Sequence, residues 1–190
     1  EDARRHGVEE RPVDVLHSDW DCTLEPVPGG FALRMGLRYV KGLGQADARR
    51  ALAARAAAPF GSLDDFVRRA QLNADDVQAL AEAGAFEAFG HDRRTALWEV
   101  KRLVHLRHRT LPVKEPEPER LFAPLDAGET IRWDYRTTHL SPRGHPIEEV
   151  RDQLRAQGLP DAKTLNATPH GRRVRYVGAV ICRQQPGTAK

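Results

Sequence analysis

Hydrophobic residues recur at helical spacing in the first third of the chain, in segments divided by glycine and proline. Leu37 and Val40 lie three positions apart, and Ala48 and Leu52 lie four apart, so each pair lies on one face of a helix. The Gly-Leu-Gly run at 42–44 separates the two pairs. The pattern therefore predicts two short helices joined by a tight hairpin.

The hairpin itself has the features of an anion-binding turn. Gly42 and Gly44 can adopt positive φ, and because they lack a Cβ another backbone can approach them closely. Leu43 lies between them and is predicted to fill the gap between the two helices. The second helix is expected to begin at about Gln45, where its free N–H groups and positive dipole end favour a phosphate.

Other segments are predicted from their caps and breakers. Ser62 and Asn73 are good N-caps for two further helices. The expected elements are a β-like run at 13–15, a segment end at the prolines and glycines of 26–30, helices over 63–70, 74–83, 93–109 and 147–157, a proline-rich linker at 110–120, irregular chain at 121–138 anchored by Trp133 and Tyr135, and a strand over 174–183. His145 is interpreted as a structural cap before the helix at 147–157.

Positive charge is concentrated at the first hairpin. The whole chain has a formal net charge of +3, whereas residues 34–55 alone carry six cations and one anion. A second, degenerate hairpin at 83–86 lies in a segment, 64–94, with seven anions and four cations. The charge favours an acidic partner at the first hairpin, and we interpret the second as a structural partner that buries the back of the first.

Several classes of protein and site are not indicated. No apolar run approaches the ~20 residues that a membrane helix needs. Cys22 and Cys182 form no C-x-x-C, which argues against a disulfide scaffold or a zinc site and favours the cytoplasm. His17 and its acidic neighbours fit no standard metal spacing, so a surface loop held by Trp20 is expected instead of a metal site.

Together these features are those of the helix-hairpin-helix motif, which binds the DNA backbone without reading its sequence. Gly-Leu-Gly alone is weak evidence, because an ordinary corner between two helices can use the same tripeptide. The apolar spacing and the local charge favour phosphate binding.

The chain resembles one region of the bacterial DNA polymerase III α subunit family, and in particular its error-prone, damage-tolerant branch. Four stretches carry the resemblance, in the order of the family: DVLHSDWDCTLE at 14–25, GLRYVKGLG at 36–44, DY at 134–135 with LSPRGHP at 140–146, and RQQPGTAK at 183–190. They span nearly the whole chain, so their combination is far more specific than the hairpin alone.

The resemblance implies a mainly α fold, with a tandem helix-hairpin-helix domain, a linker and the first strand of an incomplete OB-fold. Residues 1–30 would end the fingers region, 31–109 would form the DNA-binding domain, 110–171 would connect, and 172–190 would enter the OB-fold. The family's catalytic aspartates and their Mg²⁺ would lie in a palm domain upstream, so no catalytic residue, metal ligand or cofactor is assigned to this chain.

The leading hypothesis is a fragment of an error-prone polymerase that holds double-stranded DNA by backbone contacts. The expected DNA-binding residues are Arg38, Lys41, Gly42, Leu43, Gly44, Arg49 and Arg50. Other mutasome or replication proteins are possible partners, and no membrane is expected. Two alternatives remain open: a protein-interaction scaffold of a repair or replication complex, and a hairpin module from a nuclease or recombination protein. The family stretches at 140–146 and 183–190 argue against the second.

Overall fold

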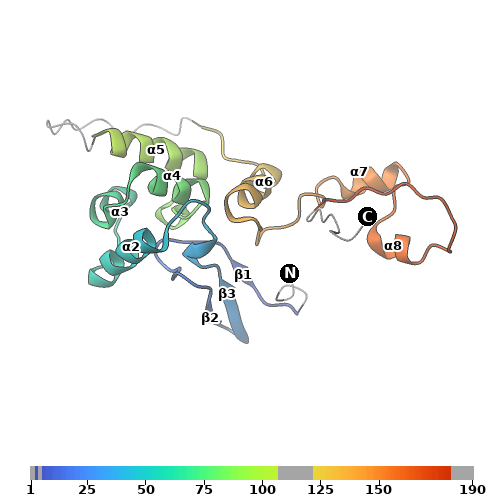
Figure 1. Ribbon diagram of the computed structural model, residues 1–190, viewed down its shortest axis with the longest axis horizontal. Helices are drawn as coiled ribbons and strands as arrows, with labels where there is room; N and C mark the ends of the chain where they lie inside the picture. The colour runs from blue at the N-terminus through green and yellow to red at the C-terminus, as the bar shows by residue number, and fades with distance from the viewer. Residues whose placement is uncertain (1–2, 4–5, 107–121, 181–190) are drawn as a thin grey trace, which may run out of the picture. The chain divides into compact units, whose positions relative to one another are not determined.

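A computed structural model describes residue 3, residues 6–106 and residues 122–180 of the chain. It divides into two compact units, residues 1–143 and 144–190, which are taken separately here. The first unit contains a small sheet and the helices α2 to α6 (Figure 1). No helix within these described ranges is long and apolar enough to cross a membrane.

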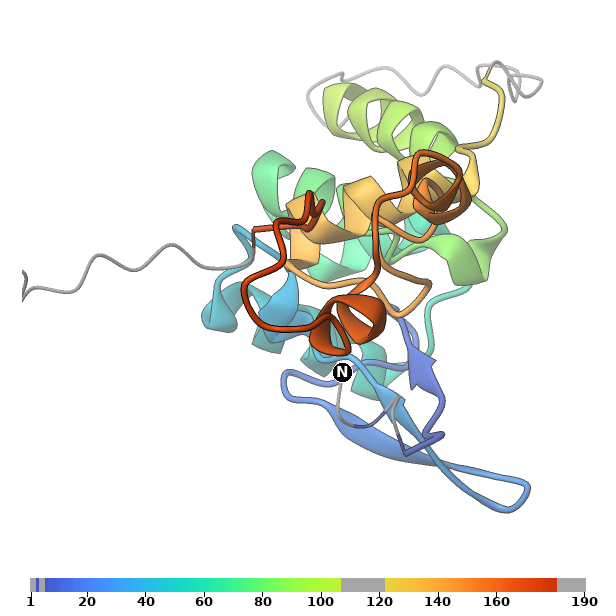
Figure 2. The same ribbon diagram turned by 90° about the vertical axis from the view of Figure 1, so that its right-hand side faces the viewer.

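The sheet has three strands in the order β1-β3-β2. β1 (Glu10–Arg11) pairs in parallel with β3 (Gly30–Arg34), and β2 (Thr23–Val27) pairs antiparallel with β3. Both ribbon views show the β2–β3 hairpin projecting away from the helices (Figures 1 and 2). The expectation that 26–30 simply ends a segment is therefore wrong, because Gly29, at φ +88°, turns the chain into a hairpin.

The helical layer matches the predicted caps closely. α2 spans Gln45–Ala57, α3 spans Leu63–Ala70, α4 spans Ala74–Glu82 and α5 spans Arg93–Leu106, with single 3₁₀ turns at Leu37–Tyr39 (η1) and Glu87–Phe89 (η2). The side chains of Ser62 and Asn73 accept hydrogen bonds from the amides of Asp65 and Asp76, as N-caps do. The rest of the predicted helix 93–109 and the predicted linker lie outside the described residues.

One hydrophobic core joins the helices to the loop at 13–20 and to the chain that follows β3. Phe66 contacts Phe60 and Phe86 edge-to-face, at centroid distances of 4.9 and 5.1 Å. Val13 and Val15 are buried in the same core, although the predicted β-like run at 13–15 forms no strand. The sheet and the helical hairpins both belong to the first compact unit, residues 1–143.

Three predictions about residues 121–157 are wrong. The segment expected to be irregular contains α6 (Ala127–Thr138), opened by a capping box in which Asp126 and Glu129 bond each other's backbone amides. The helix predicted over 147–157 is only α7 (Arg151–Ala156), preceded by turns. His145 does not cap the helix as expected, because α7 has Val150 at its N-cap and no side-chain cap. The Nδ1 of His145 instead accepts a hydrogen bond from the amide of Ile147 in the turns before α7.

The C-terminal segment does not form the predicted strand over its described part. After α8 (Ala162–Asn166), residues 171–180 are exposed and have no regular secondary structure. Residues 181–190 lie outside the described range, so the start of an OB-fold is not confirmed.

Candidate nucleic-acid interface

The first hairpin has the arrangement that its apolar spacing predicts. Leu37, Val40 and Leu43 are buried, and Leu43 fills the gap between η1 and α2. Gly42 turns the chain at φ +94°, a conformation that favours glycine. The first helix of the motif is a single 3₁₀ turn and not an α-helix.

The N-terminus of α2 differs from those of its neighbours. The first turns of α3, α4 and α6 are each capped by a side-chain oxygen, whereas Gly44 at the N-cap of α2 makes no side-chain cap. Gly44 has φ −75°, so it does not use the positive φ that glycine can adopt. Because nothing caps them, the first amides of α2 can donate to an anion that approaches the hairpin.

The six cations of the hairpin segment have different roles. Arg38 and Arg50 are exposed and pair with Asp21 and Asp47. Lys41 and Arg49 are exposed and make no ion pair within the described residues.

The other two cations of the segment are structural. Arg34 is buried and bonds Glu25, while Arg55 donates to the main-chain carbonyls of Val15 and Ser18. The charge count therefore overstated the cationic surface, and Lys41 and Arg49 are the cations best placed for phosphate. Asp47 opposes them, since its carboxylate lies beside Gly44 at the start of α2.

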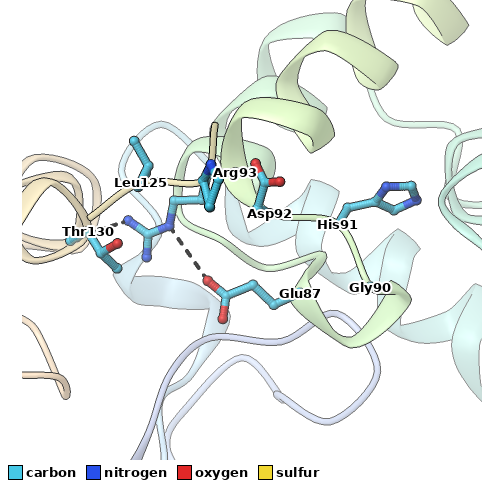
Figure 3. A pocket seen from close by; sticks show the side chains of 8 residues that line it. Glu87, Gly90, His91, Asp92, Arg93, Leu125 and Thr130 are labelled. Carbon is cyan, nitrogen blue, oxygen red and sulfur yellow. Dashed lines mark hydrogen bonds and ion pairs between the residues drawn. The ribbon is translucent and has the colours of Figure 1, made fainter. Parts of the chain in front are cut away.

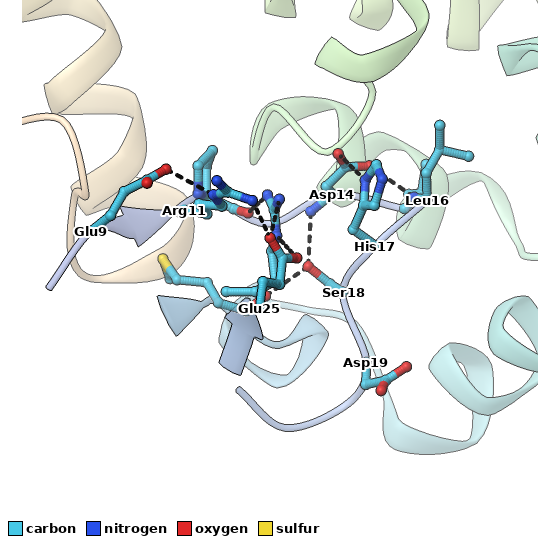
Figure 4. Close-up of polar contacts among 12 residues, drawn as sticks. Glu9, Arg11, Asp14, Leu16, His17, Ser18, Asp19 and Glu25 are labelled. Atoms are coloured by element: carbon cyan, nitrogen blue, oxygen red, sulfur yellow. Dashed lines mark hydrogen bonds and ion pairs between the residues drawn. The ribbon is translucent and has the colours of Figure 1, made fainter. Parts of the chain in front are cut away.

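A loop from the N-terminal segment holds the hairpin from behind. Ser18 donates to the carbonyl of Met35 at 2.7 Å, and Asp14 bonds the amide of Leu16 and the ring of His17 (Figure 4). The loop also accepts a hydrogen bond from η1, because the amide of Leu37 donates to the carbonyl of Asp19 at 2.8 Å.

Gly36 is required for this contact. A Cβ added there would lie 2.4 Å from the carbonyl oxygen of Trp20 and 2.4 Å from the carbonyl carbon of Asp21. The predicted loop thus proves to be a support for the hairpin backbone.

Helix α6 supports the hairpin from another side. The amide of Lys41 donates to the carbonyl of Thr137 at 2.8 Å. α6 is held in turn by the buried Asp134, which accepts hydrogen bonds from Arg93, Ser141 and Arg143.

Arg93 is the centre of that network. It donates to the carbonyl of Thr130 and lies 3.8 Å from Glu87, both at a pocket of about 270 Å³ (Figure 3). Arg143 also bonds Glu87 at 2.6 Å. Sequence reasoning missed this network, although Asp134, Ser141 and Arg143 all lie in the stretches that carried the family resemblance.

Comparison with known proteins finds relatives over the whole chain. A family model described as "Helix-hairpin-helix motif" matches residues 7–96. The whole chain is 41% identical to the error-prone DNA polymerase of Burkholderia mallei, and 99% of it is 45% identical to that of Alkalilimnicola ehrlichii. Error-prone DNA polymerase 2 of Rhizobium meliloti is 38% identical over the whole chain. Over its whole length, the chain is similar to a segment of error-prone DNA polymerases. It spans 18 to 19% of the length of these relatives.

The second hairpin of the chain is part of the core. Ala83, Ala85 and Phe86 are buried, and the carbonyl of Ala85 accepts from the amide of Val15 at 3.0 Å. Gly84 has φ +77° and is enclosed by Arg93 and Glu87. Its backbone is thus covered by protein, which agrees with a structural role.

A charged cluster joins the three strands of the sheet. Glu25 accepts from Arg34 at 2.7 Å and from Arg11 at 2.6 Å (Figure 4). The hydrogen bond from Arg34, helped by Arg11, lowers the pKa of Glu25 to about 2. Glu25 is therefore ionised throughout the physiological pH range. Its carboxylate holds the guanidinium groups of Arg11 and Arg34 on the inner face of the β2–β3 hairpin.

Proposed function

We propose that this chain is the part of an error-prone DNA polymerase that holds duplex DNA through its phosphate backbone. The observation that carries the proposal is the uncapped N-terminus of α2 between two exposed cations, Lys41 and Arg49. The amides of the first turn and the hairpin glycines bind a phosphate, and the two cations neutralise neighbouring ones.

Such contacts position the duplex and carry no sequence information. A polymerase needs this property, because the same surface must accept every sequence that passes over it. Arg38 and Arg50 reinforce the surface after releasing Asp21 and Asp47, so they contribute less than Lys41 and Arg49.

The wider role is proposed from the family resemblance, and the names of the relatives support DNA synthesis alone. DNA synthesis in a damage-tolerant, cytoplasmic complex would use a palm domain with Mg²⁺ outside this chain, and other replication or mutasome proteins would assemble with the whole enzyme. Within the chain, the proposed work is to hold the primer–template duplex.

Binding of the 190-residue chain to a fluorescent duplex, measured by anisotropy at several salt concentrations, tests the proposal. We expect sequence-independent binding with a Kd of roughly 10⁻⁴ to 10⁻⁶ M near physiological salt. With about two to four phosphates contacted, log K should fall against log salt with a slope of about −2 to −4.

Lys41→Ala and Arg49→Ala should each reduce the steepness of that slope by about one. Arg68→Ala is the control, because Arg68 is also an exposed cation, on α3, where it pairs with Asp65. Equal slopes for all four proteins, or no binding by the parent, would contradict the proposal.

A second candidate, a protein-interaction module, is favoured by one observation. On the outer face of the β2–β3 hairpin, Leu24 and Phe31 are 62% and 59% exposed, while the charged Glu25 and Arg34 lie on the inner face. A face whose apolar side chains point to solvent, while charged side chains point inward, is typical of a surface that contacts another protein. If duplex DNA binds at the helical hairpin at 42–44, the double variant Leu24→Ser, Phe31→Ser should leave duplex binding unchanged.

A further inference from the structure

The outer face of α6 carries a preorganised cation that the sequence did not indicate. Arg132, Trp133 and Arg136 lie on one side of α6, opposite the buried Ile131, and Arg136 is exposed. The guanidinium of Arg136 lies over the ring of Trp133, at 4.2 Å from its centroid. This cation–π contact holds the side chain in place and leaves its N–H groups without an ion pair among the described residues.

This face adjoins the hairpin. The carbonyl of Thr137 accepts the hydrogen bond from the amide of Lys41 at 2.8 Å, and Arg136 is the residue before Thr137. The α carbons of neighbouring residues are about 3.8 Å apart. The side chain of Arg136 therefore begins next to the point where α6 contacts the hairpin at 42–44.

Contacts with other segments hold α6 in its position. Asp134, on its buried side, is held by Arg93 and Arg143 from outside the helix. α6 also contacts α4. Arg136 is therefore presented beside the hairpin by an anchored helix.

The acidic residues of α6 do not cancel this charge. Asp134 is buried and paired, and Glu129 is bonded to Arg94 at the far end of the helix. The exposed charge near the hairpin on this helix is thus positive.

We propose that the Trp133–Arg136 pair is a second phosphate contact, continuous with the hairpin and used by the same DNA duplex. The inference rests on the proposed function and extends it to α6. A guanidinium stacked on an indole keeps donors free for a phosphodiester while losing little side-chain entropy on binding. The duplex that reaches Lys41 then extends over the C-terminal half of α6.

The test is the salt dependence of duplex binding by the 190-residue chain, with Arg136→Ala, Arg136→Lys and Trp133→Ala. Losing one phosphate contact should reduce the steepness of the slope by about 0.9 and weaken binding roughly three- to tenfold. Arg136→Lys should keep the slope, because it keeps the charge. Trp133→Ala should weaken binding and keep the slope, since it removes only the support of the guanidinium.

Arg68→Ala is again the control for an exposed arginine on another helix, and thermal unfolding of each variant shows that the fold is intact. If Lys41→Ala lowers the slope and Arg136→Ala does not, this inference is wrong while the proposed function stands. If the parent binds no duplex, both are wrong. An Arg136→Ala effect that Arg136→Lys fails to restore would also contradict a charge contact.

Discussion

The amide of Lys41 donates a 2.8 Å hydrogen bond to the carbonyl of Thr137 in the last turn of α6. The last four carbonyls of a helix have no donor within it, so the amide of Lys41 supplies a donor that the backbone of α6 cannot. The hairpin in turn has one of its amides fixed by a distant segment. The geometry of the proposed DNA contact therefore depends on residues far along the chain.

Gly36→Ala should unfold or strongly destabilise the chain. The new Cβ would lie 2.4 Å from the backbone of Trp20 and of Asp21, and backbone atoms cannot move aside as a side chain can. We expect the free energy of unfolding to fall by at least about 2 kcal/mol in urea denaturation. Gly61→Ala is the control, because nothing lies within 4 Å of its added Cβ. Equal stability of the two variants would exclude the close approach.

Asp134→Ala should be among the most damaging changes on α6. Arg93 is 2% exposed, and without Asp134 its charge stays buried with its main partner lost. A buried pair broken in this way typically costs about 3–5 kcal/mol of stability. Asp21→Ala, which breaks an exposed pair with Arg38, should cost less than about 1 kcal/mol. If Asp134→Ala and Asp21→Ala had similar midpoints in thermal or urea unfolding, the stabilising role of the Asp134 network would be contradicted.

Stability should fall in acid through Glu25. Its pKa is about 2 in the folded chain and ordinarily 4.5, so the folded state binds the proton less readily than the unfolded state. The stabilisation is complete above pH 4.5 and is lost as the pH falls toward 2, up to about 3 kcal/mol. Glu25→Gln should be less stable than the parent at pH 6, and the difference should shrink at pH 2. A difference that stays constant across this range would argue against the ion pairs.

Asp76→Asn should raise the stability of the chain at neutral pH, whereas Glu25→Gln lowers it. Asp76 is 4% exposed, its Oδ2 has no hydrogen-bond partner within the described structure, and burial raises its pKa above the ordinary 3.8. An acid with a raised pKa costs stability as the pH rises above 3.8. The variant should therefore be more stable than the parent by about 1 kcal/mol at pH 7, with no gain below pH 4. Urea unfolding at both pH values measures this, and a less stable variant at pH 7 would contradict it.

Local signals predicted the part of the fold that local physics determines. Ser62 and Asn73 cap their helices as expected, and Leu43 fills the hairpin, because each needs only its near neighbours in the sequence. α6 was missed since its buried face includes Asp134, Thr137 and Thr138, so no apolar stripe marks it. The one local signal was the capping box at Asp126 and Glu129.

The candidate site was predictable in outline only. The glycines and the helix start could be read from the hairpin itself, but ion-pair partners come from distant segments. Asp21, which pairs with Arg38, and Asp19, which pairs with Arg55, lie in a loop that charge counting over 34–55 does not include. The count of six cations therefore did not reveal that four of them are engaged.

Gly44→Asp tests the central claim most directly, because it separates DNA binding from folding. Gly44 has an ordinary φ of −75°, and its added Cβ would meet only the flexible end of Asp47. Asp is a better N-cap than Gly, so the stability of α2 should be kept or slightly raised, which thermal unfolding would show.

The measurement is duplex binding by anisotropy for the parent, Gly44→Ala and Gly44→Asp at one salt concentration. An aspartate at the N-cap occupies the amides of α2 and repels phosphate, so we predict at least a roughly tenfold loss of affinity, with Gly44→Ala between the two. A folded Gly44→Asp chain that binds duplex DNA as tightly as the parent would contradict the claim that the α2 N-terminus holds the DNA backbone.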